Sequence, residues 1–89
     1  MEERQILNTK QELQIYLKEI TAKINFIDFQ QYTTIAISKQ LLLSRNLTSH
    51  YLNEFFKEGK LVKINSRPAY FFDKQVLLES FKLQNIQNE

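Results

Sequence analysis

The 89-residue chain contains one glycine, Gly59, and one proline, Pro68, and these two positions divide its hydrophobic pattern. Before Gly59, apolar residues recur at the three- and four-residue spacings of helices. Beyond it, the alternation in 60–64, the turn residues 65–68 and the apolar run 69–72 predict a β-hairpin. Gly59 is expected to end a helix in the left-handed conformation, and Pro68 to lie at the hairpin tip or on a strand edge.

Two helices are expected in the first half of the chain. Thr9 and Glu12 have capping-box spacing, and the apolar residues that follow them indicate a first helix over about 9–24. Residues 25–33 are aromatic but irregular, which predicts a loop with one short strand. Thr34 is then expected to cap the second helix.

The third helix is expected over about 45–58, with Ser44 as its N-cap. Its two sides differ in chemistry. The packed side is expected to consist of Leu47, Thr48, Tyr51, Leu52, Phe55 and Phe56. The other side carries the polar and basic residues Arg45, Asn46, Ser49, His50 and Asn53.

A fourth helix is expected after the hairpin, capped by Asp73 and followed by a polar, irregular tail from Gln84. The order helix, helix, helix, hairpin, helix predicts a mostly helical α+β fold. Its specific form would be a winged helix-turn-helix, with a three-helix core, a hairpin wing and a C-terminal helix. Residues 1–83 would form this domain, and residues 84–89 would lead to downstream domains that the chain lacks.

Basic residues are concentrated in the middle of the chain. Residues 31–70 carry six basic and two acidic side chains, whereas each flanking region has a net charge of −1. The two acids, Glu54 and Glu58, fall at the far end of the third helix. This asymmetry indicates a polyanionic partner, with a solvated basic face as the alternative.

Residues 37–59 have the pattern of a helix-turn-helix, in which two short helices are joined by a few residues. The first helix would brace against the DNA backbone while the second enters the major groove. Arg45 suits guanine, Asn46 or Asn53 suits adenine, and basic residues of the wing suit phosphates. The alternative is that these side chains only form the solvent-exposed face of an amphipathic helix and bind nothing. The residues expected to contact double-stranded DNA are Thr34, Lys39, Ser44, Arg45, Asn46, Ser49, His50, Asn53, Lys60, Lys63 and Arg67.

Three positions depart from the usual helix-turn-helix pattern. Ser38 stands where alanine is common, and this small change fits. Leu42 stands where glycine is common, which predicts that the turn has no left-handed residue at that position. Thr48 stands where valine is common, and its hydroxyl is expected to bond back to a carbonyl of the preceding turn.

Other chemistry has little support in the sequence. The chain has no cysteine and a single histidine, which excludes a disulfide framework and argues against a metal site. No glycine-rich phosphate loop or catalytic triad is recognisable, so we expect no enzyme activity and no cofactor. No apolar run approaches the roughly 20 residues of a membrane span, so we expect a cytoplasmic location and no membrane partner. The aromatic residues expected in the core, rather than stacked on bases, are Phe26, Phe29, Tyr32, Phe71 and Phe72.

The segment 43–72, LSRNLTSHYLNEFFKEGKLVKINSRPAYFF, carries the specific patterns SRN–S–YLNE and KIN-SRP-YF. In these it resembles the N-terminal winged-helix domain of LevR/ManR-type activators of bacterial phosphotransferase-system operons. The resemblance implies binding to an upstream activating site, with sigma-54 RNA polymerase contacted only through domains that this chain lacks. Homo-oligomers would likewise belong to the full-length regulator. It assigns base reading to Arg45, Asn46, Ser49 and Asn53, and wing contacts to Lys63 and Arg67.

Two other functions remain open, a winged-helix protein-interaction module and a stand-alone dimeric repressor. The stretch 45–53 contains no acid, which favours DNA over a protein partner. An interaction surface would more often expose leucine, phenylalanine or tyrosine at positions 45, 46, 49 and 53. Dimerisation of this chain in solution would indicate the repressor.

Overall fold

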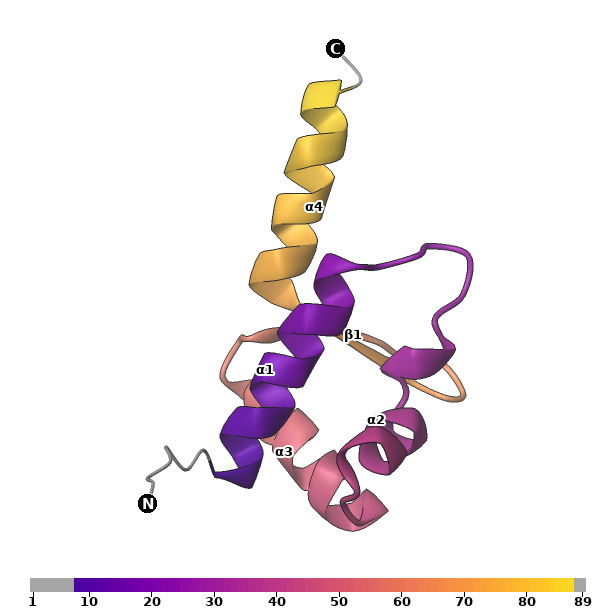
Figure 1. Cartoon of the computed structure of the whole chain (residues 1–89), viewed down its shortest axis with the longest axis vertical. Coiled ribbons are helices and arrows are strands. Elements are labelled where there is room, and N and C mark those ends of the chain that lie inside the picture. The colour runs from indigo at the N-terminus through magenta and orange to yellow at the C-terminus, as the bar shows by residue number, and fades with distance from the viewer. Residues whose placement is uncertain (1–7, 88–89) are drawn as a thin grey trace, which may run out of the picture.

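The computed structural model describes residues 8–87, with side chains as far as Lys82. Within this range the chain is a mostly helical α+β structure with four α-helices and one two-stranded antiparallel sheet (Figure 1). The predicted order of helix, helix, helix, hairpin and helix is confirmed. The elements are α1 (Thr9–Ala22), the short 3-10 helix η1 (Gln30–Tyr32), α2 (Thr34–Leu41), α3 (Arg45–Lys57), β1 (Leu61–Ile64), β2 (Tyr70–Asp73) and α4 (Lys74–Gln87).

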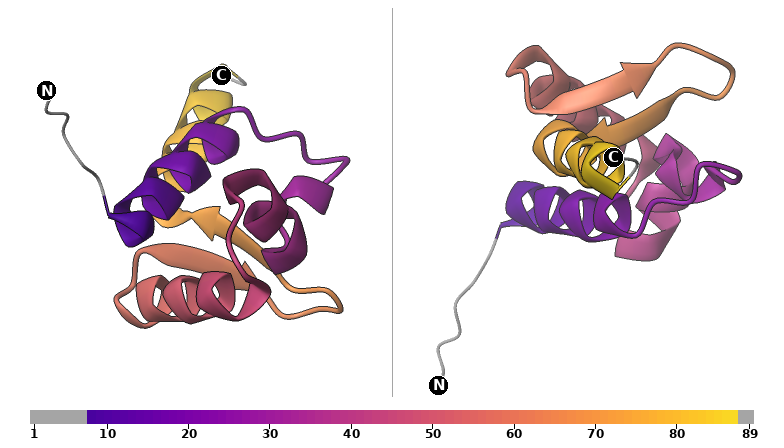
Figure 2. Two further views of the ribbon diagram at one scale, coloured as in Figure 1. Left: turned by 60° about the horizontal axis from the view of Figure 1, so that its bottom comes forward. Right: turned by 90° about the horizontal axis from the view of Figure 1, so that it is seen from above.

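The sheet is a hairpin of β1 and β2, in which Leu61 lies opposite Asp73. Its strands pass between α1 and α3, and its tip extends past the edge of the helices (Figure 2). The loop before α2 contributes one isolated bridge, from Thr33 to Tyr70, to the other edge of β2. The short strand expected within 25–33 is therefore reduced to this bridge beside η1.

The core takes side chains from every helix and from both strands. Tyr32 is fully buried against Phe72, and its hydroxyl donates a hydrogen bond to the carbonyl of Ile20. Phe26 was expected in the core but is 44% exposed, because its ring lies at the margin of the structure, against the rings of Phe29 and Phe81. The buried hydrophobic residues are Leu13, Leu17, Ile20, Tyr32, Ile37, Leu52, Phe55, Leu61, Phe71, Phe72 and Leu77.

Two helix caps differ from the predicted residues by one position. Asn8, rather than Thr9, caps α1, because its Oδ1 accepts the N–H of Gln11 while the Gln11 side chain accepts the N–H of Asn8. Thr33, rather than Thr34, caps α2 through a backbone N–H in the first turn. In both places two residues able to cap are adjacent, so the sequence alone does not distinguish them.

The predicted roles of Ser44, Gly59 and Asp73 are confirmed. The Ser44 hydroxyl accepts a backbone N–H of α3 at 3.1 Å, and the Asp73 carboxylate accepts one of α4 at 3.0 Å. Gly59 follows α3 with a left-handed φ of 80°. α4 continues to Gln87, into the polar tail that was expected to begin at Gln84.

Leu42 ends α2 in the left-handed conformation, with φ 58° and ψ 43°, so the prediction that this turn avoids such a residue is wrong. Its N–H donates to the carbonyl of Lys39 at 3.3 Å, and the N–H of Leu43 donates to that of Ser38 at 2.9 Å. This is the Schellman pattern, which glycine usually provides. Because α2 and α3 pack on one core, the chain must change direction within a few residues, and leucine adopts the required backbone.

Asp73 joins three elements although it is 1% exposed. Its N–H donates to the hydroxyl of Thr21 on α1 at 3.0 Å. Its carboxylate caps α4 and also lies 3.3 Å from the ammonium of Lys18 on α1. The end of the hairpin is thereby attached to both long helices.

Replacing Leu42 by glycine is expected to raise the free energy of unfolding by about 0.5–1 kcal/mol, because glycine adopts left-handed backbone without a steric cost. Leu42 is 91% exposed, so little packing is lost. Leu42→Ala is the matched control, since it removes the same side chain but keeps a Cβ, and it should stay within about 0.5 kcal/mol of the parent. Urea unfolding measures both, and equal stability of the two variants would contradict the assigned strain.

Candidate nucleic-acid interface

The packing of α3 determines which of its faces is left open. Thr48 and Leu52 are fully buried and Phe55 is 2% exposed, so this side belongs to the core. Leu47 and Phe56 were also expected on the packed side, but they are 36% and 44% exposed because they lie at its margins. The Thr48 hydroxyl donates to the Ser44 carbonyl at 2.9 Å, as predicted from the sequence. The opposite face carries the exposed side chains of Arg45, Asn46, His50 and Asn53 and the half-buried Ser49.

The N-terminal end of this face lies beside the hairpin tip. Thr34, Arg45 and Pro68 line one open hollow between α2, α3 and the tip. Lys39 and Pro68 line a neighbouring hollow along α2. Arg67 precedes Pro68 and is exposed. Three separate elements therefore bring basic and hydroxyl side chains to one end of α3.

The polar groups at the start of the open face are largely uncommitted. No other residue in the described part of the chain forms an ion pair with Arg45 or a side-chain hydrogen bond with Asn46. The Asn53 amide makes only a long contact of 3.5 Å with the Ser49 hydroxyl. These donors and acceptors are available to base edges without first breaking internal contacts.

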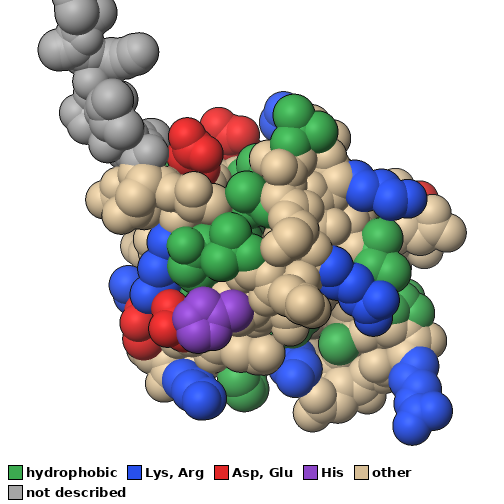
Figure 3. Space-filling model, turned by 90° about the horizontal axis from the view of Figure 1, so that it is seen from below, with side chains coloured by type: hydrophobic (Ala, Val, Ile, Leu, Met, Phe, Trp, Pro, Cys, Tyr) green, Lys and Arg blue, Asp and Glu red, His purple; other side chains and the backbone are tan. Residues whose placement is uncertain are grey.

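The two carboxylates of α3 are neutralised by lysines from outside the helix. The Nζ of Lys10, on α1, is 3.0 Å from Oε1 of Glu54 and 3.4 Å from Oε2 of Glu58. Lys60, just after α3, is 3.3 Å from Oε1 of Glu58. Nε2 of His50 lies 3.1 Å from Oε2 of Glu54. Figure 3 shows the histidine beside acidic side chains at one edge of this face, with lysines and arginines spread among hydrophobic and uncharged side chains over most of the rest.

These contacts shift two protonation equilibria. The hydrogen bond from Lys10 holds the pKa of Glu54 below its usual range, and the same contact raises the pKa of Lys10. Both shifts favour the charged forms, so the pair is ionised at neutral pH. The two lysines and two glutamates of this cluster carry no net charge between them.

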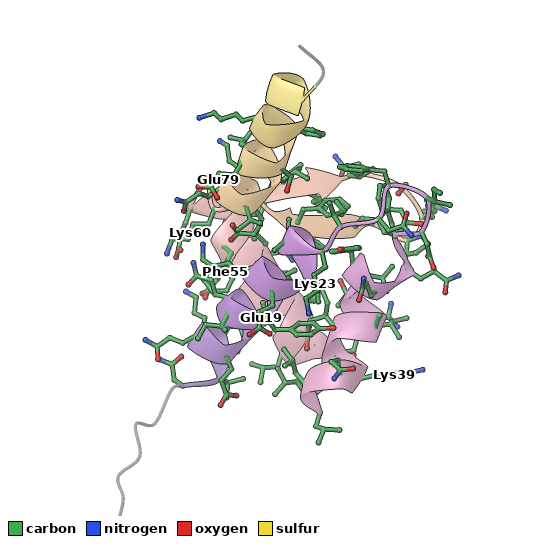
Figure 4. The ribbon with its side chains drawn as sticks, turned by 45° about the horizontal axis from the view of Figure 1, so that its top comes forward. Glu19, Lys23, Lys39, Phe55, Lys60 and Glu79 are labelled. Carbon is green, nitrogen blue, oxygen red and sulfur yellow. The ribbon has the colours of Figure 1, made fainter. Side chains whose placement is uncertain are left out.

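Lys60 lies away from the other residues expected to contact DNA. It stands at the C-terminal end of α3, with its ammonium 5.6 Å from the centre of the Phe55 ring. Figure 4 shows it on the opposite side of the molecule from Lys39. Because α3 has 13 residues and is about 20 Å long, Lys60 is also far from Arg45.

Lys63 is held against α3 rather than presented at the hairpin tip. It is half-buried on β1, and its ammonium lies 5.7 Å from the Phe56 ring and 5.6 Å from the Phe71 ring. Of the three basic residues expected on the wing, only Arg67 lies at the exposed tip.

The residues predicted from the sequence did not include Lys10. Nothing in its local sequence links it to α3, because the contact depends on how α1 packs. The pairing of His50 with Glu54 was also missed, although their four-residue spacing on a helix is a signal that identifies such pairs.

Comparison with known protein families, curated proteins and solved structures gives no match for this chain. Among the residues that the structure describes, no three histidine, cysteine, aspartate or glutamate side chains are grouped to hold a metal ion. No helix within 8–87 is long and apolar enough to cross a membrane. The surface around α3 is therefore interpreted from its own chemistry.

Glu54→Gln is expected to flatten the acid dependence of stability. Because Lys10 lowers the pKa of folded Glu54, the pair stabilises the fold above the ordinary glutamate pKa of about 4.3, and this contribution disappears as the pH falls through the lowered pKa. Urea unfolding between about pH 6 and pH 2.5 should show a smaller loss of stability for the variant than for the parent.

Glu79→Gln is the control for this measurement. Glu79 is exposed on α4 and forms no ion pair with another residue of the described range. Its variant should follow the pH profile of the parent. If the Glu54→Gln profile also coincides with the parent, the assigned pairing with Lys10 is incorrect.

Proposed function

We propose that the chain is a winged helix-turn-helix that binds double-stranded DNA, with α3 in the major groove and the hairpin as the wing. The observation that carries this proposal is the open face of α3 from Arg45 to Asn53, which is polar or basic and contains no carboxylate. The major groove is about 12 Å wide and admits an α-helix. The hairpin tip, which carries Arg67, lies beside the N-terminal end of α3, and this is the end that we propose enters the groove.

Different parts of this surface suit different parts of DNA. Arg45 is suited to a bidentate contact with guanine, and Asn46 to one with adenine. Thr34, Lys39 and Arg67 surround the same end of α3 from α2 and the hairpin. There they suit phosphates, which set the position of the protein on the duplex without reading its sequence.

The resemblance of segment 43–72 extends the proposal to the biological setting. We propose that this module reads the operator for a LevR/ManR-type bacterial regulator of sugar phosphotransferase-system genes. Contact with sigma-54 RNA polymerase would depend on other domains of such a regulator. No catalytic role is proposed for the module itself.

A protein-interaction surface is the second candidate, because apolar side chains are exposed near the junction of α2 and α3. Leu42 is 91% exposed, Ile35 45% and Leu47 36%. They flank the polar face and do not interrupt it, since positions 45, 46, 49 and 53 carry no apolar residue. DNA therefore fits the face of α3 better than a protein partner does.

Selection from a random pool of duplexes tests the proposal directly, and an enriched sequence is the expected result. A single domain reading one half-site can bind weakly, so the selection should be repeated with a dimerised fusion. Absence of any enriched sequence with either form would overturn the proposal and favour a protein partner.

Arg45→Ala is expected to weaken binding to the selected sequence by about 1–3 kcal/mol and to relax the preference at one base pair. The measurement is fluorescence anisotropy at fixed salt. Lys82→Ala, which removes an exposed basic side chain from α4, is the control and should bind like the parent. An unchanged affinity for Arg45→Ala would remove this residue from the interface.

Arg67→Ala is expected to weaken binding to selected and unrelated duplexes alike, because a phosphate contact is independent of sequence. The slope of log affinity against log salt should decrease in magnitude by about 1. A titration over several salt concentrations measures it. A loss confined to the selected sequence would assign base reading, rather than phosphate binding, to the hairpin tip.

A further inference from the structure

We infer that Lys10 on α1 is a positioning residue for DNA binding, which neutralises the carboxylates of Glu54 and Glu58 so that α3 can approach phosphates. The inference rests on the proposed function. Lys10 itself would not touch DNA. Its effect would pass through the two glutamates that share the helix with the proposed base-reading residues.

One ammonium serves both carboxylates because of helix geometry. Glu54 and Glu58 are four residues apart, and side chains at this spacing lie on the same side of a helix. The Nζ of Lys10 reaches both, at 3.0 and 3.4 Å. It also lies 5.1 Å from the centre of the Phe55 ring, which is 2% exposed and therefore fixed in the core. The contact thus joins α1 to the C-terminal half of α3.

The charged groups around Glu54 come from three segments. Lys10 lies on α1, His50 and Lys57 lie on α3 itself on either side of Glu54, and Lys60 lies after the end of α3. Lys60 contacts Glu58 but has no ion pair with Glu54 in the described residues. Without Lys10, the ion pairs left in the described residues would be His50 with Glu54 and Lys60 with Glu58, and Lys57 would remain a more distant positive charge near Glu54.

The position of Glu54 makes its charge relevant to DNA. It directly follows Asn53, the last residue of the open polar face. Duplex DNA carries one phosphate per roughly 1.7 Å of its axis, and charges interact over about 8–10 Å at moderate salt. A helix lying in the groove would therefore bring an unpaired Glu54 within range of several phosphates, and repulsion would oppose binding.

If Lys10 acted only on the fold, its replacement would weaken DNA binding by destabilising the domain. Lys10, Glu54 and Glu58 are 31%, 40% and 44% exposed, and ion pairs between exposed side chains contribute little to folding stability. Lys10→Gln should therefore remain folded at neutral pH, with only a small loss of stability. An effect on DNA affinity would then have to arise from charge rather than from unfolding.

The test is a double-mutant cycle on the duplex found by selection. Lys10→Gln should weaken binding about three- to tenfold near 50 mM salt, and less at higher salt because the repulsion is screened. In a background that carries Glu54→Gln and Glu58→Gln, the same Lys10→Gln change should have no effect. Lys82→Gln, on α4, removes the same charge elsewhere and is the matched control. Thermal unfolding of each variant verifies that it is folded.

The outcomes separate the two proposals. If the parent selects no duplex, the proposed function fails and the role of Lys10 fails with it. If the parent binds but Lys10→Gln binds equally well, only the role of Lys10 is overturned. If Lys10→Gln weakens binding to the same extent in the neutral-glutamate background, Lys10 acts directly on DNA or on the fold, and the inference is also overturned.

Discussion

The buried carboxylate of Asp73 is the constraint on which the arrangement of the other elements depends. An ionised side chain removed from water costs several kcal/mol unless it is paired and hydrogen-bonded. The Asp73 carboxylate meets this requirement where α1 and the start of α4 come together, through Lys18 and the first turn of α4, while the backbone N–H of Asp73 donates to the Thr21 hydroxyl. The hairpin is therefore anchored at its base, while its tip remains free to reach over α2.

The anchored hairpin leaves one place for α3, against β1 and the core. Burial of Thr48, Leu52 and Phe55 then sets the rotation of the helix about its axis, so the polar face must point outward. The left-handed turn at Leu42 sets the direction in which α3 leaves α2. Lys10 completes the surface by pairing the acids of α3 from a distant part of the chain. α3 contains both acidic and basic residues, but its acids are paired, so its N-terminal end presents basic and neutral polar groups.

Local sequence determined the features that depend on neighbouring residues. The four helices and the hairpin followed from hydrophobic periodicity, and the ends of α3 from Ser44 and Gly59. The back-bonding of Thr48 and the cap at Asp73 were also predictable, because each forms within one helical turn. The members of the polar face of α3 followed from helical spacing alone. Where two capping residues were adjacent, at the starts of α1 and α2, the sequence placed the helix end only to within one position.

Packing between distant segments decided the rest. Propensity argued against left-handed backbone at Leu42, but the need to place two helices on one core overrode it. Phe26 is half exposed because α4 covers only one side of its ring, which its own hydrophobicity cannot reveal. Lys60, Lys63 and Arg67 were all expected to contact DNA, yet the ammonium groups of Lys60 and Lys63 lie against aromatic rings of α3, away from the hairpin tip. The sequence by itself determined the polar residues that α3 exposes, because they follow from helical spacing. Only the tertiary structure decided that Leu47 and Phe56 are exposed as well, and which charges remain unpaired beside them, because burial and ion pairs depend on distance in space and not on separation along the chain.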